Sequence, residues 1–313
     1  MKILFIDTVH PLLTDLLQKE GHECIDGSKL SFEELKKILP QYEGAVIRSR
    51  FIFNKELLGC GINLKFIARA GAGMENIDAS YATQKGITCI NSPEGNRDAV
   101  GEQAIAMLLA LFNNLLRADK EVREGKWIRE GNRGVELQGK TVCIIGYGNT
   151  GSVFAKKLSG FECNVLAYDK YRKGFGNTFV KEVQMQEILD KADILSLHIP
   201  LTDETEYLVN DAFIKNFKRN FYLINTSRGR CVKTDDVVVN LKSGKILGAC
   251  LDVNEYEESS FESSKADGMQ SESWKYLLRS DKVILTPHIA GWTHESNEKM
   301  ARVLFEKIKK QFP

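Results

Sequence analysis

The sequence predicts an α/β protein with two domains, each built around a doubly wound parallel sheet. Short apolar, β-branched runs alternate with helix-length amphipathic segments along most of the 313 residues. A cluster of turn-forming residues, Asn91–Asn96, interrupts this alternation, and a long apolar stretch of helical periodicity follows it. A glycine-rich turn after residue 145 then begins a second series of strands and helices. A chain of this length is also typical of two domains.

The first series occupies residues 2–90. We expect strands at Lys2–Thr8, Ala45–Arg48, Leu64–Arg69 and Ile87–Ile90. We expect helices at Pro11–Lys19, Phe32–Leu39 and Met74–Lys85, and a helical turn at Lys55–Leu58. Ser31 and Glu34 have the spacing of a capping box, which predicts that a helix begins at Phe32. This half has no glycine fingerprint and is therefore not expected to bind a second nucleotide.

A long helix, from Arg97 to Val122, is predicted to open the second half. Further strands are expected at residues 141–145, 164–168, 194–197, 221–224, 246–250 and 283–285. The helices between them are expected at residues 149–159, 184–190, 210–217, 234–242 and 274–278. A closing helix, about 293–310, is expected to return to the first domain. The predicted domains are therefore 1–96 with 290–313, and 97–289.

The strand at Thr141–Ile145 leads into a G-x-G-x-x-G motif made by Gly146, Gly148 and Gly151. The first glycine permits a tight turn, the second lets a pyrophosphate approach the backbone, and the third lets the next helix pack on the sheet. That helix, beginning with Asn149 and Thr150, would direct its N-terminal N–H groups at the phosphates. This context of strand, turn and helix predicts a Rossmann-type dinucleotide site.

The next apolar run ends at Asp169, which stands 18 residues after the last glycine of the motif. An acidic side chain near this offset binds the ribose hydroxyls of a dinucleotide. Its charge would repel a 2′-phosphate, so we expect NAD rather than NADP. The basic residues Lys170, Arg172 and Lys173 follow at once and weaken that preference. A methyltransferase also has a glycine loop and an acid after its second strand, and remains an alternative.

The composition excludes several classes of function. It is 43% hydrophobic and 27% charged, as in ordinary globular proteins. The formal net charge of +1 gives no overall field to recruit nucleic acid or an acidic membrane. No apolar run approaches the ~20 residues of a membrane span, and the N-terminus is too quickly polar for a signal peptide. Seven scattered cysteines lack a CxxC pair and metal-ligand spacing, which indicates a cytoplasmic protein without a metal.

Three later strands end in side chains suited to hydride transfer. The strand at 221–224 leads to Arg228, the strand at 246–250 leads to Asp252 and Glu257, and the strand at 283–285 leads to His288. The carboxyl ends of parallel strands share one edge of a sheet, where ligands bind. Arginine can bind a carboxylate, histidine can accept a hydroxyl proton, and a neighbouring acid can fix the tautomer of the histidine. His198 is a competing base.

Taken together, these motifs resemble the D-isomer-specific 2-hydroxyacid dehydrogenases over nearly the whole chain. The matching segments are Arg69–Asp78, Asn91–Asn96, Gly146–Gly151, Asp169, His198–Pro200, Asn225–Gly229, Leu251–Val253, Glu257 and Thr286–Ala290. The resemblance implies a flavodoxin-like substrate domain, a Rossmann NAD-binding domain and a cleft between them that closes over the ligands. It also implies a homodimer that forms through the NAD-binding domain.

The resemblance also implies a role for each matching residue. Arg228 would bind the substrate carboxylate, His288 would be the general acid and base, and Glu257 would pair with His288. Asp252 would hold the nicotinamide end of the cofactor. Further residues lining the cofactor would be His198, Pro200 and Thr226. The backbone N–H groups of Gly71, Ala72 and Gly73 would help bind the carboxylate of a 2-hydroxy or 2-keto acid.

The substrate is predicted from the first domain. Arg48 and Arg69 resemble the phosphate-binding positions of 3-phosphoglycerate dehydrogenases, and Arg129 adds to that resemblance. They predict 3-phosphoglycerate and 3-phosphohydroxypyruvate as substrates, in serine biosynthesis. The alternatives are a glyoxylate or hydroxypyruvate reductase and, from a different class, an NAD-sensing regulator similar to transcriptional corepressors. Formate is disfavoured, because formate dehydrogenases have glutamine in place of Glu257.

Two expectations concern segments beyond the predicted site. The stretch 258–281 is longer than in the family and lacks the proline that usually follows the glutamate. The sequence ends at Pro313, so we expect no C-terminal regulatory domain and no feedback by serine through such a domain.

Overall fold

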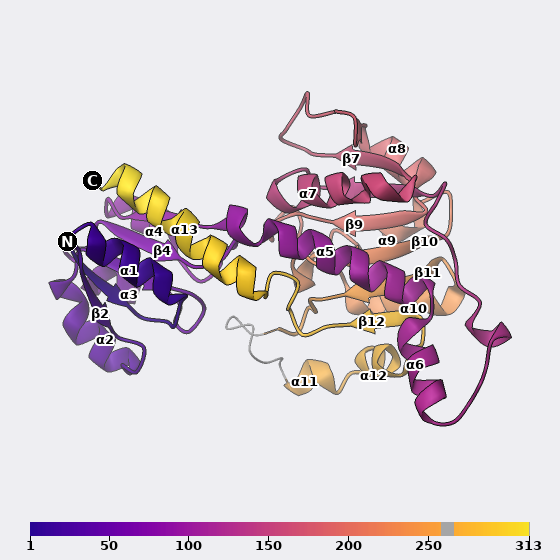
Figure 1. Ribbon diagram of the computed structural model, residues 1–313, viewed down its shortest axis with the longest axis horizontal. Coiled ribbons are helices and arrows are strands. Elements are labelled where there is room, and N and C mark those ends of the chain that lie inside the picture. The colour runs from indigo at the N-terminus through magenta and orange to yellow at the C-terminus, as the bar shows by residue number, and fades with distance from the viewer. Residues whose placement is uncertain (258–265, 313) are drawn as a thin grey trace. The chain divides into compact units, whose positions relative to one another are not determined.

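The computed structural model describes residues 1–257 and 266–312 (Figure 1). Within these residues the chain forms a five-stranded sheet and a seven-stranded sheet, and the strand pairs in both are parallel. The prediction of two parallel α/β domains is therefore confirmed. By its internal contacts the described chain divides into a first unit, residues 1–97 with 292–312, and a second unit, residues 98–257 with 266–291.

The sheet of the first unit has the strand order β2-β1-β3-β4-β5, which is the flavodoxin-like order. Its strands are β1 (Lys2–Phe5), β2 (Glu23–Asp26), β3 (Gly44–Ile47), β4 (Phe66–Arg69) and β5 (Thr88–Asn91). Its helices are α1 (Pro11–Lys19), α2 (Phe32–Ile38), α3 (Lys55–Cys60), α4 (Ala79–Gln84) and α13 (His294–Gln311). The capping box of Ser31 and Glu34 is present at the start of α2.

Two apolar clusters cover the two faces of this sheet. On one face, Leu13 of α1 and Leu304 of α13 pack with Val46 and Phe66 of the central strands. On the other face, Leu35 of α2 and residues of α3 and α4 form the second cluster. The C-terminal helix α13 thus completes the core of the first unit, and Lys307 on it binds Glu94 at 2.8 Å.

The sheet of the second unit has the order β12-β11-β10-β9-β6-β7-β8, as in Rossmann folds with one added strand. Its strands are β6 (Thr141–Ile145), β7 (Asn164–Tyr168), β8 (Lys181–Glu182), β9 (Ile194–Leu197), β10 (Phe221–Asn225), β11 (Ile246–Leu251) and β12 (Val283–Leu285). The strand order reverses between β6 and β9. In sheets of this kind, ligands bind at the carboxyl ends of the strands beside this reversal.

Helices cover both faces of the second sheet (Figure 1). The helices on one face are α5 (Pro93–Phe112) and α7 (Asn149–Lys157). Those on the other face are α8 (Met185–Lys191), α9 (Asp211–Lys215), α10 (Thr234–Ser243) and α12 (Glu272–Arg279). The remaining helices are α6 (Leu115–Arg123) and α11 (Ala266–Met269).

The structure corrects several predicted elements. The long helix predicted for 97–122 is two helices, α5 and α6, which meet at an angle of 60°. Asn114 lies at the break with a φ of 51°, in the left-handed region that asparagine tolerates better than most residues. α5 begins at Pro93, inside the predicted turn cluster, and α4 is shorter than predicted because Asp78 caps its first turn. The edge strands β2 and β8 were not predicted.

No single helix in the described part of the chain is long and apolar enough to span a membrane; only the bent pair α5 and α6, taken together, meets that test of length and composition. The apolar residues of α5, among them Ala104, Leu108 and Phe112, lie in the core of the second unit. Part of the predicted loop 258–281, residues 258–265, lies outside the described residues.

Candidate active site

The glycine turn lies where strands β6 and β9 separate. Gly146 has a φ of +94°, and a Cβ there would lie 2.3 Å from the carbonyl oxygen of His198. A Cβ on Gly151 would lie 2.1 Å from the carbonyl oxygen of Gly146. Gly148, in contrast, has open space at its Cβ position and provides no side-chain cap to α7. The turn is thus closely packed on its inner side and open at the N-terminus of the helix, as a pyrophosphate requires.

The carboxylate of Asp169 lies at the end of β7 beside this turn. Its Oδ2 accepts a hydrogen bond from the N–H of Tyr147 at 2.8 Å, and its Oδ1 accepts from the N–H groups of Tyr171 and Arg172. Burial by itself raises the pKa of Asp169, but these backbone hydrogen bonds and the charge of Arg172 outweigh it and lower the pKa. The carboxylate therefore stays ionised, with its position fixed relative to the glycine turn.

His198 lies at the end of β9 and is buried. Its Nε2 is 2.9 Å from Ser196 Oγ, its Nδ1 is 3.2 Å from Thr150 Oγ1, and its ring packs on Phe154. Burial lowers the pKa of His198 to about 3, so the imidazole is neutral at physiological pH. This geometry argues against His198 as the proton carrier. The side chain instead links β9 to the first turn of α7 through Thr150.

Two further predicted cofactor residues lie near this edge. The Oγ1 of Thr226 is buried and has no hydrogen-bond partner among the described residues. A buried hydroxyl without a partner costs free energy, which a ligand would recover. Pro200 is exposed after β9, and its carbonyl accepts a hydrogen bond from Thr205 Oγ1.

His288 and Glu257 are in direct contact. His288 Nδ1 lies 3.0 Å from Glu257 Oε2, and the two side chains are 23% and 12% exposed. His288 has a φ of 55°, a left-handed conformation that is unfavourable for a residue of this type. Strain of this kind is found where surrounding contacts fix a functional residue.

Those fixing contacts come mainly from Asp252. Its carboxylate is almost fully buried and accepts hydrogen bonds from Thr286 Oγ1, from the N–H of Ile289 and from the N–H of Ala290. Its backbone carbonyl accepts from the N–H of His288 at 2.7 Å. Asp252 was predicted to hold the nicotinamide, and the structure shows its carboxylate holding the loop that carries His288.

Arg228 lies at the end of β10, two strands from β12 on the same carboxyl edge of the sheet. One guanidinium nitrogen donates to the carbonyl of Ser227 at 2.7 Å. The next residue, Gly229, packs directly against the 254–257 turn, since a Cβ on it would lie 1.8 Å from the carbonyl oxygen of Asn254. The loops that follow β10, β11 and β12 are therefore in contact, and they hold the arginine, the glutamate and the histidine at one edge.

In the first unit, the loop after β4 is held by Arg69. This side chain is buried, and it donates from Nε to the carbonyl of Arg48 at 3.0 Å and from a terminal nitrogen to the carbonyl of Gly73 at 2.8 Å. The N–H of Gly71 donates to Ser92 Oγ, and the carbonyl of Ala72 accepts from Asn91. In the structure Arg69 positions the loop of Gly71, Ala72 and Gly73, and its predicted contact with substrate stays a prediction.

Arg48 has a different environment. Its guanidinium lies 4.0 Å from the centre of the Trp292 ring, and this ring is 61% exposed. Stacking on an aromatic face restrains an arginine without removing its charge. Of the two predicted arginines, Arg48 is therefore the one suited to meet an anion.

Residues that follow β6, β7 and β10 fit NAD. The open side of Gly148 leaves room for a pyrophosphate, and the ionised Asp169 suits a ribose. The hydroxyl of Thr226, which has no partner among the described residues, suits a polar group of the cofactor. Within residues 1–257 and 266–312, no group of three or more His, Cys, Asp or Glu side chains could hold a metal ion.

The chain is similar to known proteins in both sequence and structure. The family model "D-isomer specific 2-hydroxyacid dehydrogenase, NAD binding domain" matches residues 105–290. D-3-phosphoglycerate dehydrogenase of Archaeoglobus fulgidus is 36% identical over 310 residues, which are 98% of this chain and 56% of the relative. Hydroxypyruvate reductase of Thermotoga maritima is 34% identical over 298 residues, 95% of this chain and 94% of the relative. The solved D-lactate dehydrogenase of Aquifex aeolicus, complexed with NAD and lactic acid, has a TM-score of 0.82 at 28% identity, covering 99% and 95% of the two chains.

The chain therefore belongs to the D-isomer specific 2-hydroxyacid dehydrogenases, a family of NAD-dependent oxidoreductases that act on the CH–OH group. The predicted family and the predicted cofactor, NAD, are confirmed, and the methyltransferase alternative is set aside. The chain spans about half the length of the phosphoglycerate dehydrogenase just named and nearly the whole length of the hydroxypyruvate reductase.

Asp169 should set the preference for NADH over NADPH. Asp169→Asn removes the charge and keeps one oxygen, which can accept the hydrogen bonds made to one of the two carboxylate oxygens. Repulsion of a 2′-phosphate at ~4 Å amounts to about 1–4 kcal/mol, so we expect the ratio of kcat/KM for NADH to that for NADPH to fall about tenfold or more. Steady-state rates with each cofactor measure this ratio, and an unchanged ratio would remove Asp169 from cofactor selection.

His198 should make the stability of the second unit depend on pH. The unfolded chain binds a proton at this imidazole near its ordinary pKa of 6.5, whereas the folded protein does so only near a pKa of about 3. The contribution of His198 to the free energy of unfolding is therefore complete above the pKa of the unfolded chain and is lost as the pH falls below that value. Between about pH 7 and about pH 4.5, wild type should lose about 2 kcal/mol more than His198→Gln. Urea unfolding of both proteins at the two pH values measures the difference, and parallel losses would contradict the prediction.

Proposed function

We propose that the chain catalyses the NAD-dependent interconversion of a D-2-hydroxy acid and the corresponding 2-keto acid. The observation that carries this proposal is the contact between His288 Nδ1 and Glu257 Oε2 at the carboxyl edge that also bears Arg228. His288 would act as the general acid and base, and Glu257 as the partner of His288. Arg228 would bind the substrate carboxylate. Membership of the family supports these roles.

The chemistry follows from the properties of these side chains. In the oxidation, the C2 hydroxyl gives its proton to Nε2 of His288, and the hydrogen on C2 departs with its electron pair. NAD supplies the acceptor for that hydride when it is bound at the glycine turn. In the reverse direction His288 returns the proton to the keto oxygen. Glu257, bound at Nδ1, stabilises the imidazolium and keeps Nε2 directed at the substrate.

Two groups would orient the substrate. Arg228 can pair bidentately with its carboxylate, which places C2 and its oxygen relative to His288. The N–H groups of Ala72 and Gly73 would bind the same carboxylate, whereas the N–H of Gly71, which was also predicted to do so, already donates to Ser92 Oγ. Arg69 supports that loop through the carbonyl of Gly73.

For the substrate we favour 3-phosphoglycerate and 3-phosphohydroxypyruvate, and hence a role in serine biosynthesis. Two observations support this choice. The relative from Archaeoglobus fulgidus is a D-3-phosphoglycerate dehydrogenase and matches over 98% of this chain. Arg48, restrained by Trp292, provides a positive charge suited to a phosphate.

A second candidate is reduction of hydroxypyruvate or glyoxylate. It is favoured by the Thermotoga maritima hydroxypyruvate reductase, because that relative is matched over 94% of its own length. An NAD-sensing regulator is the candidate from another class. It would bind NADH tightly and would oxidise it with none of the 2-keto acids.

The assembly and location belong to the same proposal. We propose a homodimer that forms through the NAD-binding domain, residues 97–289, with 1–96 and 290–313 as the substrate domain. Exposed apolar side chains on α6 and just after it support a protein contact there: Leu115 and Leu116 are 58% and 59% exposed, and Trp127 is 81% exposed.

We propose a cytoplasmic location, consistent with seven cysteines that are all free thiols.

His288→Asn tests the catalytic assignment. Asparagine tolerates the left-handed backbone of this position, so the variant should fold. It lacks a group that can carry the proton, and we expect kcat to fall about 10²-fold or more, with the Kd for NADH within about twofold of wild type. Stopped-flow turnover and NADH fluorescence titration give the two quantities. Wild-type kcat in this variant would exclude His288 from the reaction.

Arg48→Ala tests the substrate class. NADH oxidation is measured with phosphohydroxypyruvate, hydroxypyruvate, glyoxylate and pyruvate. We expect wild type to prefer phosphohydroxypyruvate, and the variant to lose about 10- to 100-fold in kcat/KM for it, because a charge-assisted hydrogen bond to the phosphate is worth about 1.5–3 kcal/mol. Hydroxypyruvate has no phosphate and is the internal control. An equal loss on both substrates would assign Arg48 to the fold, and a wild-type preference for glyoxylate would favour the second candidate.

A further inference from the structure

Residues 254–257 form a closed turn around the carboxylate of Glu257. The N–H of Asn254 donates to Glu257 Oε1 at 2.8 Å, and the N–H of Glu257 donates back to the carbonyl of Asn254 at 3.3 Å. The N–H of Tyr256 donates to Asn254 Oδ1 at 2.9 Å. The other oxygen of Glu257, Oε2, contacts His288. The location of the turn therefore decides whether the glutamate reaches the histidine.

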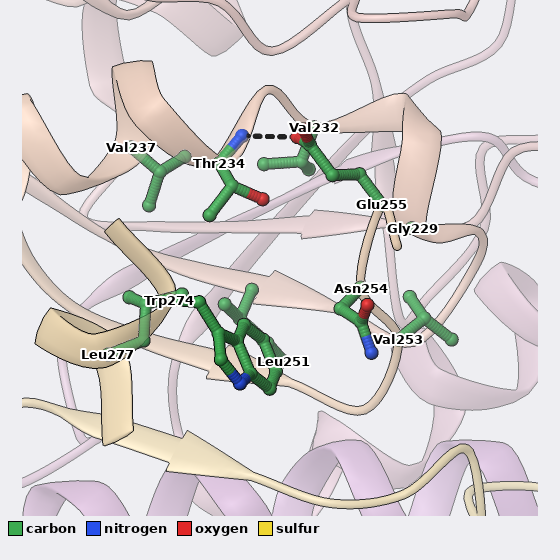
Figure 2. A pocket seen from close by; sticks show the side chains of 10 residues that line it. All are labelled: Gly229, Val232, Thr234, Val237, Leu251, Val253, Asn254, Glu255, Trp274 and Leu277. Atoms are coloured by element: carbon green, nitrogen blue, oxygen red, sulfur yellow. Dashed lines mark hydrogen bonds between the residues drawn. The ribbon is translucent and has the colours of Figure 1, made fainter. Parts of the chain in front are cut away.

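One side chain of this turn binds a separate helix. Oε2 of Glu255 accepts a hydrogen bond from the N–H of Thr234 at 2.6 Å, in the first turn of α10 (Figure 2). The residue before that turn, Lys233, provides no side-chain cap. A carboxylate at this end of a helix is stabilised by the hydrogen bond and by the helix dipole. Since Val237, Val238 and Leu241 of α10 are buried in the core, Glu255 binds the turn to a firmly packed element.

The other contacts of the turn are mainly apolar, such as that between Tyr256 and Trp274. Beside the turn lies a small pocket with room for no more than about one water molecule (Figure 2). Apolar side chains line it, among them Leu251, Trp274 and Leu277, together with Asn254 and Glu255. Apolar contacts are non-directional, so the hydrogen bond between Glu255 and Thr234 is the contact that sets the direction of the turn on this side. The carbonyl of Asn254 is held on another side by its close contact with Gly229.

We propose that Glu255 is a positioning residue, which fixes the 254–257 turn on α10 so that Glu257 meets His288. Glu255 has no role in the chemistry itself and acts through Glu257. The inference rests on the proposed function, because it assigns proton transfer to His288 with Glu257 as its partner. The two glutamates of the turn therefore have different partners. Glu255 binds the start of α10, and Glu257 binds the imidazole of His288.

The test compares substitutions at the two glutamates. Glu255→Ala should lower kcat about 10- to 100-fold, as expected when a catalytic group is displaced by about 1 Å, and should leave the Kd for NADH within about twofold. Glu255→Gln keeps an oxygen that accepts from Thr234 and should restore most of kcat. The double variant Glu255→Ala/Glu257→Gln should be no slower than Glu257→Gln alone, because both substitutions remove the same interaction.

Asp236→Ala is the matched control. Asp236 lies on the same helix and accepts a backbone hydrogen bond from Asp211 at 2.9 Å, outside the predicted site, so its loss should leave kcat unchanged. Additive losses in the double variant, or no recovery in Glu255→Gln, would overturn the positioning role. If Glu257→Gln is impaired while Glu255→Ala has wild-type kcat, only this inference fails. If Glu257→Gln itself has wild-type kcat, the proposed catalytic pair fails first.

Discussion

The buried carboxylate of Asp252 is the contact on which the candidate site depends. It stands at the end of a central strand and accepts three hydrogen bonds from the loop that follows the neighbouring strand. An acceptor with this little exposure is stabilised only when such donors surround it. The loop in turn must bend so that His288 takes a left-handed backbone. Strand order, buried charge and local strain therefore combine to place one imidazole at the sheet edge.

The two histidines of this edge have opposite environments. His198 is enclosed by Phe154 and two hydroxyl groups, with no carboxylate in hydrogen-bond contact in the described structure, and burial keeps it neutral. His288 is partly exposed and touches a carboxylate. A protonated imidazole is stabilised by a neighbouring negative charge and destabilised by burial. The same type of side chain therefore links β9 to α7 in one place and pairs with Glu257 in the other.

Much of the architecture could be predicted because its signals are local. The capping box at Ser31 and the glycine turn after β6 involve residues close in sequence, and both are present in the structure. The edge strand β2 was missed because only Cys24 and Ile25 are apolar within it, and its ends are exposed. The break between α5 and α6 was missed because the apolar periodicity continues across Asn114, and only its backbone angle interrupts the helix.

The contacts of the predicted site residues could be anticipated from the sequence only in part, for the same reason. The contact between Glu257 and His288 follows from two strand ends that share an edge, and strand order can be inferred from a parallel fold. The tasks of Arg69 and Glu255 depend on hydrogen bonds to particular backbone groups of other segments. Thr234 lies 21 residues from Glu255, and no spacing rule links a helix start to an acid at that separation. Sequence patterns identify side chains suited to catalysis or binding more readily than they identify the groups to which those side chains hydrogen-bond.

The return of α13 to the first unit has a consequence for biosynthesis. Leu304 and Ile308 fill the same cluster as Val46 and Phe66, although they lie at least 238 positions apart in the sequence. During translation, α1 can cover part of that face of the first sheet early, but the cluster is complete only after α13 has been made. The second unit ends at residue 291, before α13 begins, so its chain is made completely first, and the part of the protein that is made first finishes folding last.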